Sequence, residues 1–309
     1  MTAIRRLALV ITCLAVVQCG GSTPTGPTTE VPLQPLPPGP PAPAPVPLPS
    51  SVPQVFVGAG DIAVCDANAE ATARLLDTIG GTVFTLGDAA YFQGTTQQFR
   101  DCYDPTWGRH KSRTRPVPGN HEYESPGAAP YFAYFGANAG PPGLGYYSFD
   151  LGDWHAIALN SNVAVDAGSS QGAWLRSDLA TSRARCTVAY WHHPLFTSGP
   201  NGPSPRMRDF WRMLYAAGVE LVLNGHDHLY ERFAEQDPDG RPDPARGIRE
   251  IIAGTGGAPG YQTITVSANS DMRITNGFGV LRLTLRADGY EWQFVPISGR
   301  ADTGTAACH

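Results

Sequence analysis

The strongest constraint on this chain is a series of five polar clusters, each of which directly follows a short apolar run typical of a buried strand. The runs cover residues 55–57, 83–86, a short stretch ending at 117, 188–191 and 219–223. The clusters are Gly60-Asp61, Gly87-Asp88-Ala89-Ala90-Tyr91, Gly119-Asn120-His121-Glu122, His192-His193 and Gly225-His226-Asp227-His228. Because open α/β sheets gather their ligands beyond the carboxyl ends of the strands, the series predicts one composite site.

The side chains in these clusters form a ligand set for two metal ions, because they supply carboxylates, an amide, imidazoles and a phenol. Two metals about 3.5–4 Å apart need one bridging carboxylate, and Asp88 is the natural candidate. Of the eight histidines in the chain, five lie in the clusters. A single Gly-Asn-His or Gly-His-x-His could be a turn with an ordinary core histidine, but five such clusters in order favour chemistry.

Residues 1–19 are predicted to be an export signal. Arg5 and Arg6 precede an apolar run, 7–17, that is too short to span a bilayer as a helix. Cys19, followed by two glycines and a serine, is similar to the lipidated cysteine of bacterial lipoproteins, although Gln18 departs from that pattern. The protein is therefore expected to be exported, and secreted, periplasmic and membrane-anchored forms all remain open, the last through a tether on lipidated Cys19.

Residues 20–53 form a proline-rich linker, with thirteen of the 29 prolines between positions 24 and 53. Such a segment favours polyproline II, and at about 3.1 Å per residue it would reach roughly 100 Å. It is either a stalk that holds the protein off a membrane or a linker with no length requirement. The remaining residues, 54–309, are expected to form one catalytic domain.

Charge and cysteine usage narrow the class further. The formal net charge is -5, and no basic tract could neutralise a run of phosphates, so nucleic acid is not an expected partner. Four cysteines follow the signal, which in an exported protein favours disulfides over metal-binding thiols. Three pairings are possible, and the favoured one joins Cys65 to Cys102, which flank neighbouring site loops, and Cys186 to Cys308, which would fix the carboxyl terminus.

Local patterns predict several elements around the clusters. Helical spacing of apolar residues covers 67–78 and 206–217, each ended by glycine. The β-rich runs 280–285 and 290–295 flank Asp288-Gly289, a hairpin signal, so the sheet should contain antiparallel as well as parallel strands. The glycine-rich stretch 254–257 lacks the ending of a P-loop, and a tight turn near the site is the preferred interpretation.

The cluster series resembles the calcineurin-like metallophosphoesterase superfamily, most specifically in the block 225–232. Most of that superfamily has a histidine two residues after the first aspartate, whereas this chain has Ala63. Tyr91, three residues after Asp88, would replace the missing ligand, as in the purple acid phosphatase branch, of which small bacterial members are the nearest expectation. The resemblance implies an α/β (α+β) fold: a four-layer sandwich of two mixed β-sheets flanked by helices.

The same resemblance implies the roles of the cluster residues. The implied ligands are Asp61, Asp88, Tyr91 and His228 for the first metal and Asp88, Asn120, His192 and His226 for the second. His121 would contact the phosphate and help to protonate the leaving oxygen. A phenolate suits trivalent iron, so the family predicts iron at the first position and zinc, manganese or iron at the second.

Other polar residues near the clusters receive weaker interpretations. His193 either touches substrate or makes a structural hydrogen bond beside Pro194, and His155 is expected to be a strand histidine. Asp227 and Glu231 are expected either to support the site from behind or to form a surface pair.

The resemblance implies an exported, dinuclear, metal-dependent phosphoesterase of the acid phosphatase type. It would hydrolyse small phosphomonoesters by attack of a metal-activated hydroxide. A phosphodiesterase or nucleotidase with the same site is the alternative, and the site loops that would decide between them are 123–147 and 198–208. A hypothesis of another class is a surface lipoprotein that has lost catalysis and uses the fold for binding.

Overall fold

The computed structural model describes residues 52–263 and 265–309. The expected signal, Cys19 and residues 20–51 of the linker lie outside the described residues. Within the described part, no helix combines the length and the apolar composition that crossing a bilayer requires.

Six strands form the first sheet, in the order β13-β12-β11-β1-β2-β3. They are β1 (Gln54–Ala59), β2 (Thr82–Leu86), β3 (Thr114–Val117), β11 (Gly279–Arg286), β12 (Gly289–Pro296) and β13 (Asp302–Ala307). Strands β1, β2 and β3 are parallel, whereas β11, β12 and β13 add antiparallel pairs. The β11-β12 pair is the predicted hairpin, closed where Arg286 faces Gly289.

Seven strands form the second sheet, in the order β10-β8-β9-β7-β6-β5-β4. They are β4 (Tyr147–Leu151), β5 (Trp154–Ala158), β6 (Cys186–Tyr190), β7 (Leu221–Asn224), β8 (Leu229–Phe233), β9 (Arg249–Ala253) and β10 (Ser270–Thr275). Strands β5, β6, β7 and β9 are parallel, and β4, β8 and β10 pair antiparallel at the two sides. Both sheets are therefore mixed, as predicted.

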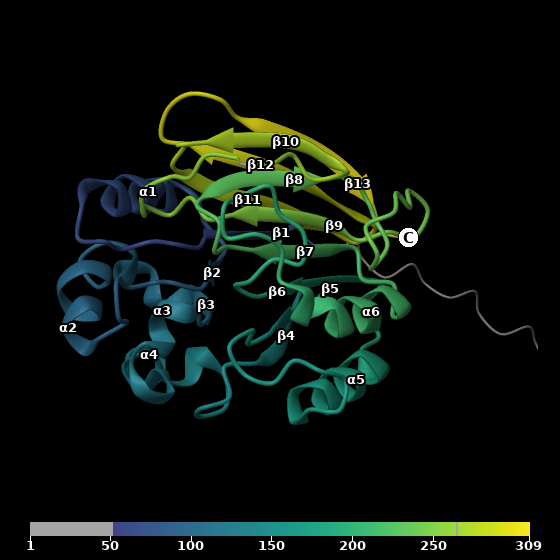
Figure 1. The fold of residues 1–309 in the computed structure, drawn as a ribbon, viewed down its shortest axis with the longest axis horizontal. Helices are drawn as coiled ribbons and strands as arrows, with labels where there is room; N and C mark the ends of the chain where they lie inside the picture. The colour runs from purple at the N-terminus through teal and green to yellow at the C-terminus, as the bar shows by residue number, and fades with distance from the viewer. Residues whose placement is uncertain (1–51, 264) are drawn as a thin grey trace, which may run out of the picture. The chain divides into compact units, whose positions relative to one another are not determined.

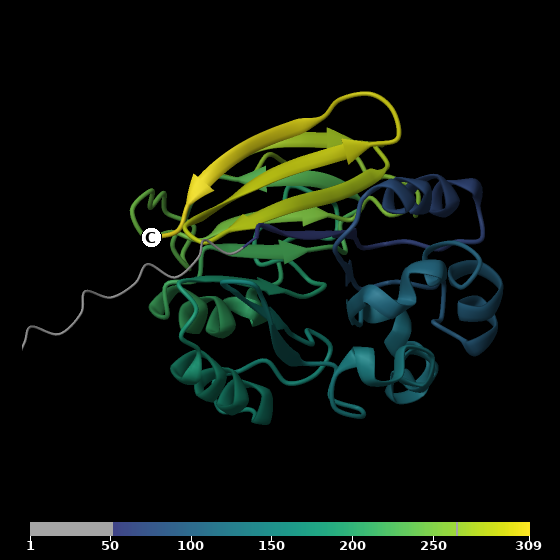
Figure 2. The same cartoon turned by 180° about the vertical axis from the view of Figure 1, so that it is seen from behind.

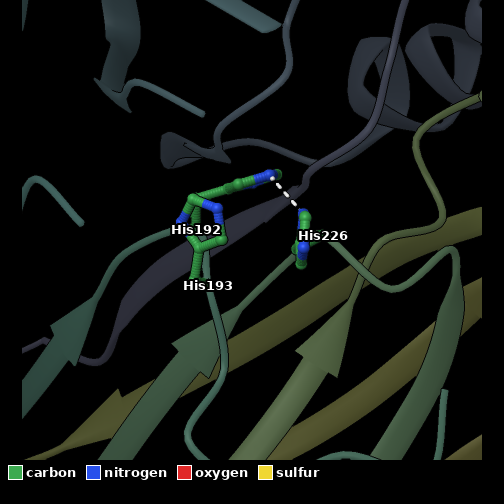
Figure 3. A group of neighbouring side chains, drawn as sticks. All are labelled: His192, His193 and His226. Atoms are coloured by element: carbon green, nitrogen blue, oxygen red, sulfur yellow. Dashed lines mark hydrogen bonds between the residues drawn. The ribbon is translucent and has the colours of Figure 1, made fainter. Parts of the chain in front are cut away.

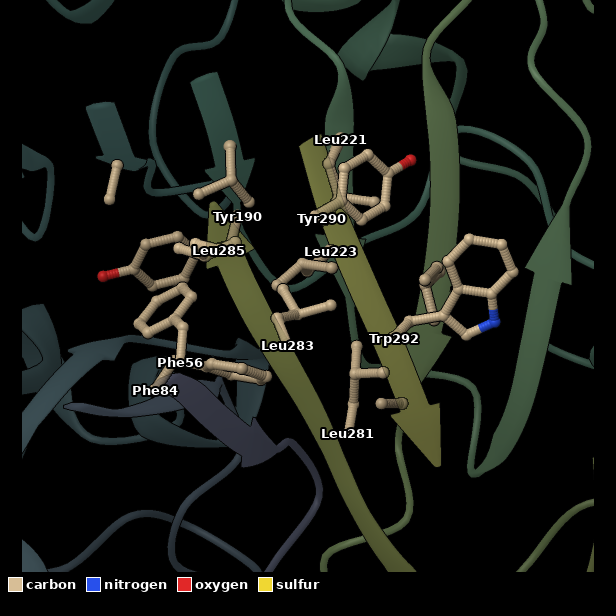
Figure 4. Packing of buried hydrophobic residues seen from close by; sticks show 14 of the residues in the cluster. Phe56, Phe84, Tyr190, Leu221, Leu223, Leu281, Leu283, Leu285, Tyr290 and Trp292 are labelled. Carbon is tan, nitrogen blue, oxygen red and sulfur yellow. The ribbon is translucent and has the colours of Figure 1, made fainter. Parts of the chain in front are cut away.

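The two sheets pack face to face through one apolar core. Phe56 and Phe84 of the first sheet meet Tyr190 of the second, with ring centroids 5.5 Å apart between Phe56 and Tyr190 (Figure 4). Leu221 and Leu223 point into the same layer, and all five side chains are fully buried. Burying a large apolar side chain contributes about 1.5–3 kcal/mol, so this layer fixes how one sheet sits on the other.

Helices cover the outer faces of the sheets. Helix α1 (Ala67–Thr78) packs on the first sheet through Ala69, Ala73 and Leu76, beside Val57 and Val83. Helices α5 (Ser170–Thr181) and α6 (Arg208–Ala216) lie together on the second sheet, as Figures 1 and 2 both show. The predicted four-layer arrangement of two mixed sheets between helices is confirmed.

Shorter elements complete the chain. The α-helical ones are α2 (Thr96–Gln98), α3 (Asn120–Tyr123) and α4 (Ala129–Phe135). Residues Phe99–Tyr103 form a π-helical turn, and 3₁₀ turns cover Trp107–Arg113, Pro126–Ala128, Gly136–Ala139 and Pro205–Met207.

Two elements begin later in the structure than the sequence predicts. The helix expected from residue 206 begins with the 3₁₀ turn Pro205–Met207, because proline suits the first turn of a helix, and becomes α-helical at Arg208. The strand expected from 219 begins at Leu221, since Val219 instead packs under α6. The prediction of a helix over 67–78 matches α1 at both ends, and the Asp66 side chain caps it by accepting from the Asn68 N–H.

Both predicted disulfides are present. Cys65 bonds to Cys102 across 37 residues, and Cys186 bonds to Cys308 across 122 residues. The first holds the segment after the β1 loop against the π-helical turn, and the second attaches the end of the chain to β6. Closing such loops removes conformational entropy from the unfolded chain, more so for the longer loop.

Candidate metal centre

All five polar clusters begin at the carboxyl end of a strand, as predicted. The first sheet contributes Asp61, Asp88, Tyr91 and Asn120 from the ends of β1, β2 and β3, and the second contributes His192, His226 and His228 from β6 and β7. The site therefore lies where strand ends of both sheets meet.

The loops hold these residues in unusual backbone conformations. Asp61, Asp88 and His226 have φ values of 59°, 51° and 71°, in the left-handed region that costs energy for residues other than glycine. A Cβ on Gly119 would lie 2.1 Å from Oδ1 of Asp88, so only glycine lets these two loops approach so closely. The local sequence is therefore shaped to bring the polar side chains together.

A first group of atoms gathers around the Tyr91 hydroxyl. Its oxygen lies 2.8 Å from Oδ1 of Asp61, 3.3 Å from Oδ2 of Asp88 and 3.1 Å from Nε2 of His228. His228 Nε2 is also 3.3 Å from Oδ1 of Asp61. Asp61 is fully buried, and Asp88, Tyr91 and His228 nearly so. These four side chains are the predicted ligands of the first metal.

A second group gathers around Nε2 of His192. This nitrogen lies 3.0 Å from Oδ1 of Asn120, 3.1 Å from Oδ2 of Asp88 and 3.2 Å from Nδ1 of His226. Figure 3 shows the His192 and His226 rings pointing toward each other from the loops after neighbouring strands. These four side chains are the predicted ligands of the second metal.

One oxygen belongs to both groups. Oδ2 of Asp88 is 3.3 Å from the Tyr91 hydroxyl and 3.1 Å from Nε2 of His192. The other oxygen, Oδ1, accepts a hydrogen bond of 2.9 Å from the His121 N–H, which orients the carboxylate. Asp88 therefore occupies the position expected of a bridging residue.

Backbone carbonyls set the orientation of two imidazoles. Nδ1 of His192 lies 2.7 Å from the Leu86 carbonyl oxygen, and Nδ1 of His228 lies 2.8 Å from that of Pro259. Because a carbonyl only accepts, Nδ1 carries the proton in both rings, and the lone pair of the neutral ring is on Nε2, facing the site. Metal-binding histidines are commonly fixed in this way.

The electrostatics of the cluster call for positive charge. Burial, with the charges of Asp61 and Asp88, raises the pKa of Tyr91 well above its usual value. Burial disfavours the charged form of His192, but Asp88 outweighs this effect and raises its pKa to about 9. The metal-free site thus keeps protons on Tyr91 and His192, and cations that displaced these protons would leave a phenolate and a neutral imidazole as ligands.

Sequence reasoning assigned no role to Glu122, which lies at the back of the site. Its Oε2 accepts from the N–H groups of Asp88 at 2.9 Å and Gly119 at 2.7 Å, and its Oε1 from those of Ala89 at 2.8 Å and Ala90 at 3.3 Å. Burial, with the nearby charge of Asp88, raises the pKa of Glu122 to about 7. One carboxylate therefore holds the loop that carries Asp88 against the loop that carries Asn120.

His121 lies at the edge of the cluster and is partly exposed. Its Nδ1 is 2.6 Å from the Phe92 carbonyl oxygen, and its Nε2 is 3.9 Å from Oδ2 of Asp88. The carbonyl fixes the proton on Nδ1, so Nε2 is the nitrogen left to face a substrate. This placement agrees with the expected role of His121, which is next to the metal ligands without being one of them.

His193 and His155 both have hydrogen-bond partners on their ring nitrogens. His193 belongs to the site region, with its ring 4.4 Å from that of His226, and its Nδ1 is 2.8 Å from Oγ of Ser161. A structural hydrogen bond therefore exists, with Ser161 as the partner. His155 is a strand histidine on β5, as predicted, with Asp150 at 2.9 Å and Asp178 at 2.8 Å on its two nitrogens.

Asp227 and Glu231 are both buried, so the surface-pair alternative is wrong. Asp227 accepts from the Thr197 hydroxyl at 2.6 Å, and Glu231 accepts from the Ser198 N–H at 2.8 Å. The two carboxylates satisfy polar groups of the loop after β6 and so support the site from behind. Sequence alone could not show this, because their partners are about 30 residues away.

Two features line the region around His228. The Tyr261 ring, which sequence reasoning missed, stacks on the His228 ring, with centroids 4.0 Å apart and an angle of 7° between the ring planes. The glycine stretch 254–257, predicted to be a tight turn, lies near the site as expected but is an irregular segment that bends at Gly256 and Gly257, and the Gly256 N–H donates to the Gly60 carbonyl at 2.8 Å. The Gly256 contact packs a loop of the second sheet against the loop that carries Asp61, whereas the Tyr261 contact joins two loops of the second sheet.

The fold and the two donor groups together indicate the family of proteins to which the chain belongs. A four-layer α/β sandwich with two facing groups of oxygen and nitrogen donors, joined by one carboxylate, fits two cations that act together on one substrate. The chain belongs to the calcineurin-like phosphoesterase family, whose model matches residues 55–230.

The relatives within that family are more particular. Purple acid phosphatase 15 of Arabidopsis thaliana is 28% identical over 225 residues, which cover 61% of this chain and 42% of that protein. This chain spans about half the length of the curated relatives it matches. The predicted resemblance to purple acid phosphatases is confirmed.

Solved structures support the fold. A purple acid phosphatase from seeds of yellow lupin (Lupinus luteus) superposes with a TM-score of 0.71, at 17% identity, over 83% of this chain and 54% of that one. GAP50, described as the anchor in the inner membrane complex of Plasmodium, superposes with a TM-score of 0.64, at 15% identity, over 84% of this chain and 90% of that one. At such identities the likeness concerns the fold alone.

Proposed function

We propose that this protein is an exported, metal-dependent phosphoesterase that uses two metal ions to hydrolyse phosphomonoesters. The observation that carries the proposal is the shared oxygen Oδ2 of Asp88, which lies within 3.3 Å of the Tyr91 hydroxyl in one donor group and of Nε2 of His192 in the other. The relatives named purple acid phosphatases support the activity, and the two disulfides agree with export.

The donor set supports the choice of metals. Asp61, Tyr91 and His228 would complete a first site, in which a phenolate and two carboxylates suit trivalent iron. Asn120, His192 and His226 would complete a second site that suits zinc, manganese or iron. When bound, the two ions would supply a water ionised near neutral pH and neutralise charge on the phosphoryl oxygens.

The protein's own residues would orient the reaction. Carbonyl groups hold His192 and His228 with Nε2 facing the donor groups that would bind the metals, and the Glu122 carboxylate holds the Asp88 loop. His121, fixed on the Phe92 carbonyl through Nδ1, would donate a proton from Nε2 to the departing ester oxygen. The residue is in place for general acid catalysis because its backbone N–H also bonds the Asp88 carboxylate.

The domain organisation follows from the same proposal. Residues 1–19 would direct export, 20–53 would link, and 54–309 would form the catalytic domain. A lipid on Cys19 would tether the enzyme to a membrane, whereas simple cleavage would release it.

The test is hydrolysis of p-nitrophenyl phosphate beside bis-p-nitrophenyl phosphate by the purified protein loaded with iron, zinc or manganese, with a chelated control. We expect the monoester to be preferred and the activity to disappear on chelation. Asp88→Asn should remove activity and bound metal together, whereas Asp101→Asn, at an exposed carboxylate paired with Arg100, should change neither.

Other outcomes lead to other functions. Preference for the diester would assign a phosphodiesterase to the same site. Absence of turnover with every metal, in a protein that is folded, would refute the proposal and favour a binding protein built on this fold.

A further inference from the structure

Phe92 presents an apolar ring to solvent beside the site. Its side chain is 60% exposed, whereas nearly all other large apolar side chains of the described residues are covered. The exceptions besides Phe92 are Val52, Leu144, Val266 and Ile297, so Phe92 is the one aromatic residue in this exposed group. An exposed ring at a site is more informative than a scattered aliphatic side chain, because apolar lining positions ligands.

The position of the ring relates it to the leaving group. Its centroid is 5.6 Å from that of Tyr91 and 6.2 Å from that of His121. Since His121 would protonate the departing ester oxygen, the exposed Phe92 ring lies near the place where the leaving group would depart. A ring attached directly to that oxygen would come within reach of the Phe92 ring, because aromatic rings attract one another at centroid distances of about 4.5–7 Å.

The backbone around Phe92 is held on several sides. The Tyr91 N–H donates to the Ala63 carbonyl at 3.0 Å, and the Gly94 N–H donates to the Ala90 carbonyl at 3.1 Å. The Gln93 carbonyl accepts from the Ser125 hydroxyl at 2.7 Å. The ring is therefore displayed from a fixed loop, so little conformational entropy is lost when a ligand covers it.

The second aromatic residue of this region does not offer the same surface. One face of the Tyr261 ring is already stacked on His228 at 4.0 Å, and Tyr261 is only partly exposed. Phe92 is thus the better placed of the two to receive a ring from a substrate.

We infer that Phe92 determines specificity and selects phosphomonoesters with an aromatic leaving group over those with a small alkyl group. The inference rests on the proposed function and adds to it the class of substrate. Phe92 takes no part in proton transfer or metal binding, since its carbonyl, which holds His121, remains when the side chain is changed.

The test compares phenyl phosphate with ethyl phosphate in the metal-loaded wild type, Phe92→Ala and Phe92→Tyr. Phe92→Ala should lower kcat/KM for phenyl phosphate about 10-fold, mainly through KM, and change that for ethyl phosphate less than about 2-fold. Phe92→Tyr, which keeps the ring, should retain the preference. Ile297→Ala, which removes an exposed apolar side chain of another loop, should leave both substrates unchanged.

A binding measurement gives a second readout. Phenylphosphonate should bind about 10-fold more weakly to Phe92→Ala than to the wild type, whereas methylphosphonate should bind equally to both. Equal effects on the aromatic and alkyl ligands, or no effect on either, would overturn the inference. If the wild type hydrolyses neither ester, the proposed function fails, and the two phosphonates still decide the role of Phe92.

Discussion

The substitution Glu122→Gln tests whether one buried carboxylate holds the site loops together. The two oxygens of Glu122 accept from four backbone N–H groups, those of Asp88, Ala89, Ala90 and Gly119. Glutamine keeps the shape but has one accepting oxygen, so its amide group must face two of these donors. Each buried donor left without an acceptor costs about 1–3 kcal/mol, and the variant should lose about 2–6 kcal/mol of stability.

The assay is urea unfolding of the chelated protein, followed by tryptophan fluorescence, at about pH 5. Because the pKa of Glu122 is raised to about 7, its ionisation costs the wild type stability as the pH rises toward that value, so the deficit of Glu122→Gln should narrow at higher pH. Glu250→Gln is a matched control, because Oε1 of Glu250 accepts from the Leu195 N–H and Oε2 has no hydrogen-bond partner among the described residues. Its stability should be unchanged or higher. A loss below about 0.5 kcal/mol in Glu122→Gln would refute the reasoning, since that is the scale of an ordinary surface change.

Further predictions concern the phenol, the long disulfide and the strand histidine. Tyr91→Phe should lower the iron content measured by elemental analysis, because it removes the hydroxyl that lies beside Asp61 and Asp88, and it should also cost the metal-free fold about 1–3 kcal/mol, since that hydroxyl donates a buried hydrogen bond to Asp61. Tyr103→Phe, at a buried hydroxyl without a hydrogen-bond partner in the described structure, should leave the metal content intact. Replacing Cys186 and Cys308 together by alanine should cost about 5 kcal/mol in denaturant unfolding, since the bond closes a loop of 122 residues, and an unchanged midpoint would contradict this. Burial opposes the charge of His155, but its two carboxylate partners outweigh burial and raise its pKa above 6.5. The stability that the charged ring contributes is therefore full below pH 6.5 and is lost as the pH rises through the folded-state pKa. His155→Gln should flatten this part of a plot of unfolding free energy against pH.

Much of the site could be predicted because its residues are local to strand ends. Asp61, Asp88 and Asn120 each follow a run of apolar residues, and such runs fold as parallel strands whose carboxyl ends meet. The helix α1 could be predicted to the residue because Asp66 caps one end and glycines follow the other. In these places the local sequence and the final structure agree.

The parts that could not be predicted depend on contacts between distant residues. From the sequence, Glu122 has only the pattern of a residue in the first turn of a helix. Its role depends on the Asp88 loop, 34 positions earlier, which folds against it. No local sequence pattern predicts that Ser161 hydrogen-bonds to His193. Tyr261 stacks on His228 because of how the loop that carries Tyr261 packs. Strand β13 (Asp302–Ala307) has few of the residues typical of strands and is held by its pairing with β12.

The division of the donor groups between the sheets has a mechanical consequence. Ions bound here would crosslink the two sheets, because the loops of one sheet supply Asp61 and Asp88 and the loops of the other supply His192 and His226. Any sliding of the sheets would change both coordination shells at once. The aromatic packing around Phe56, between the sheets, is therefore expected to influence metal affinity. A smaller side chain there, which leaves a cavity, should weaken metal binding although no ligand is changed.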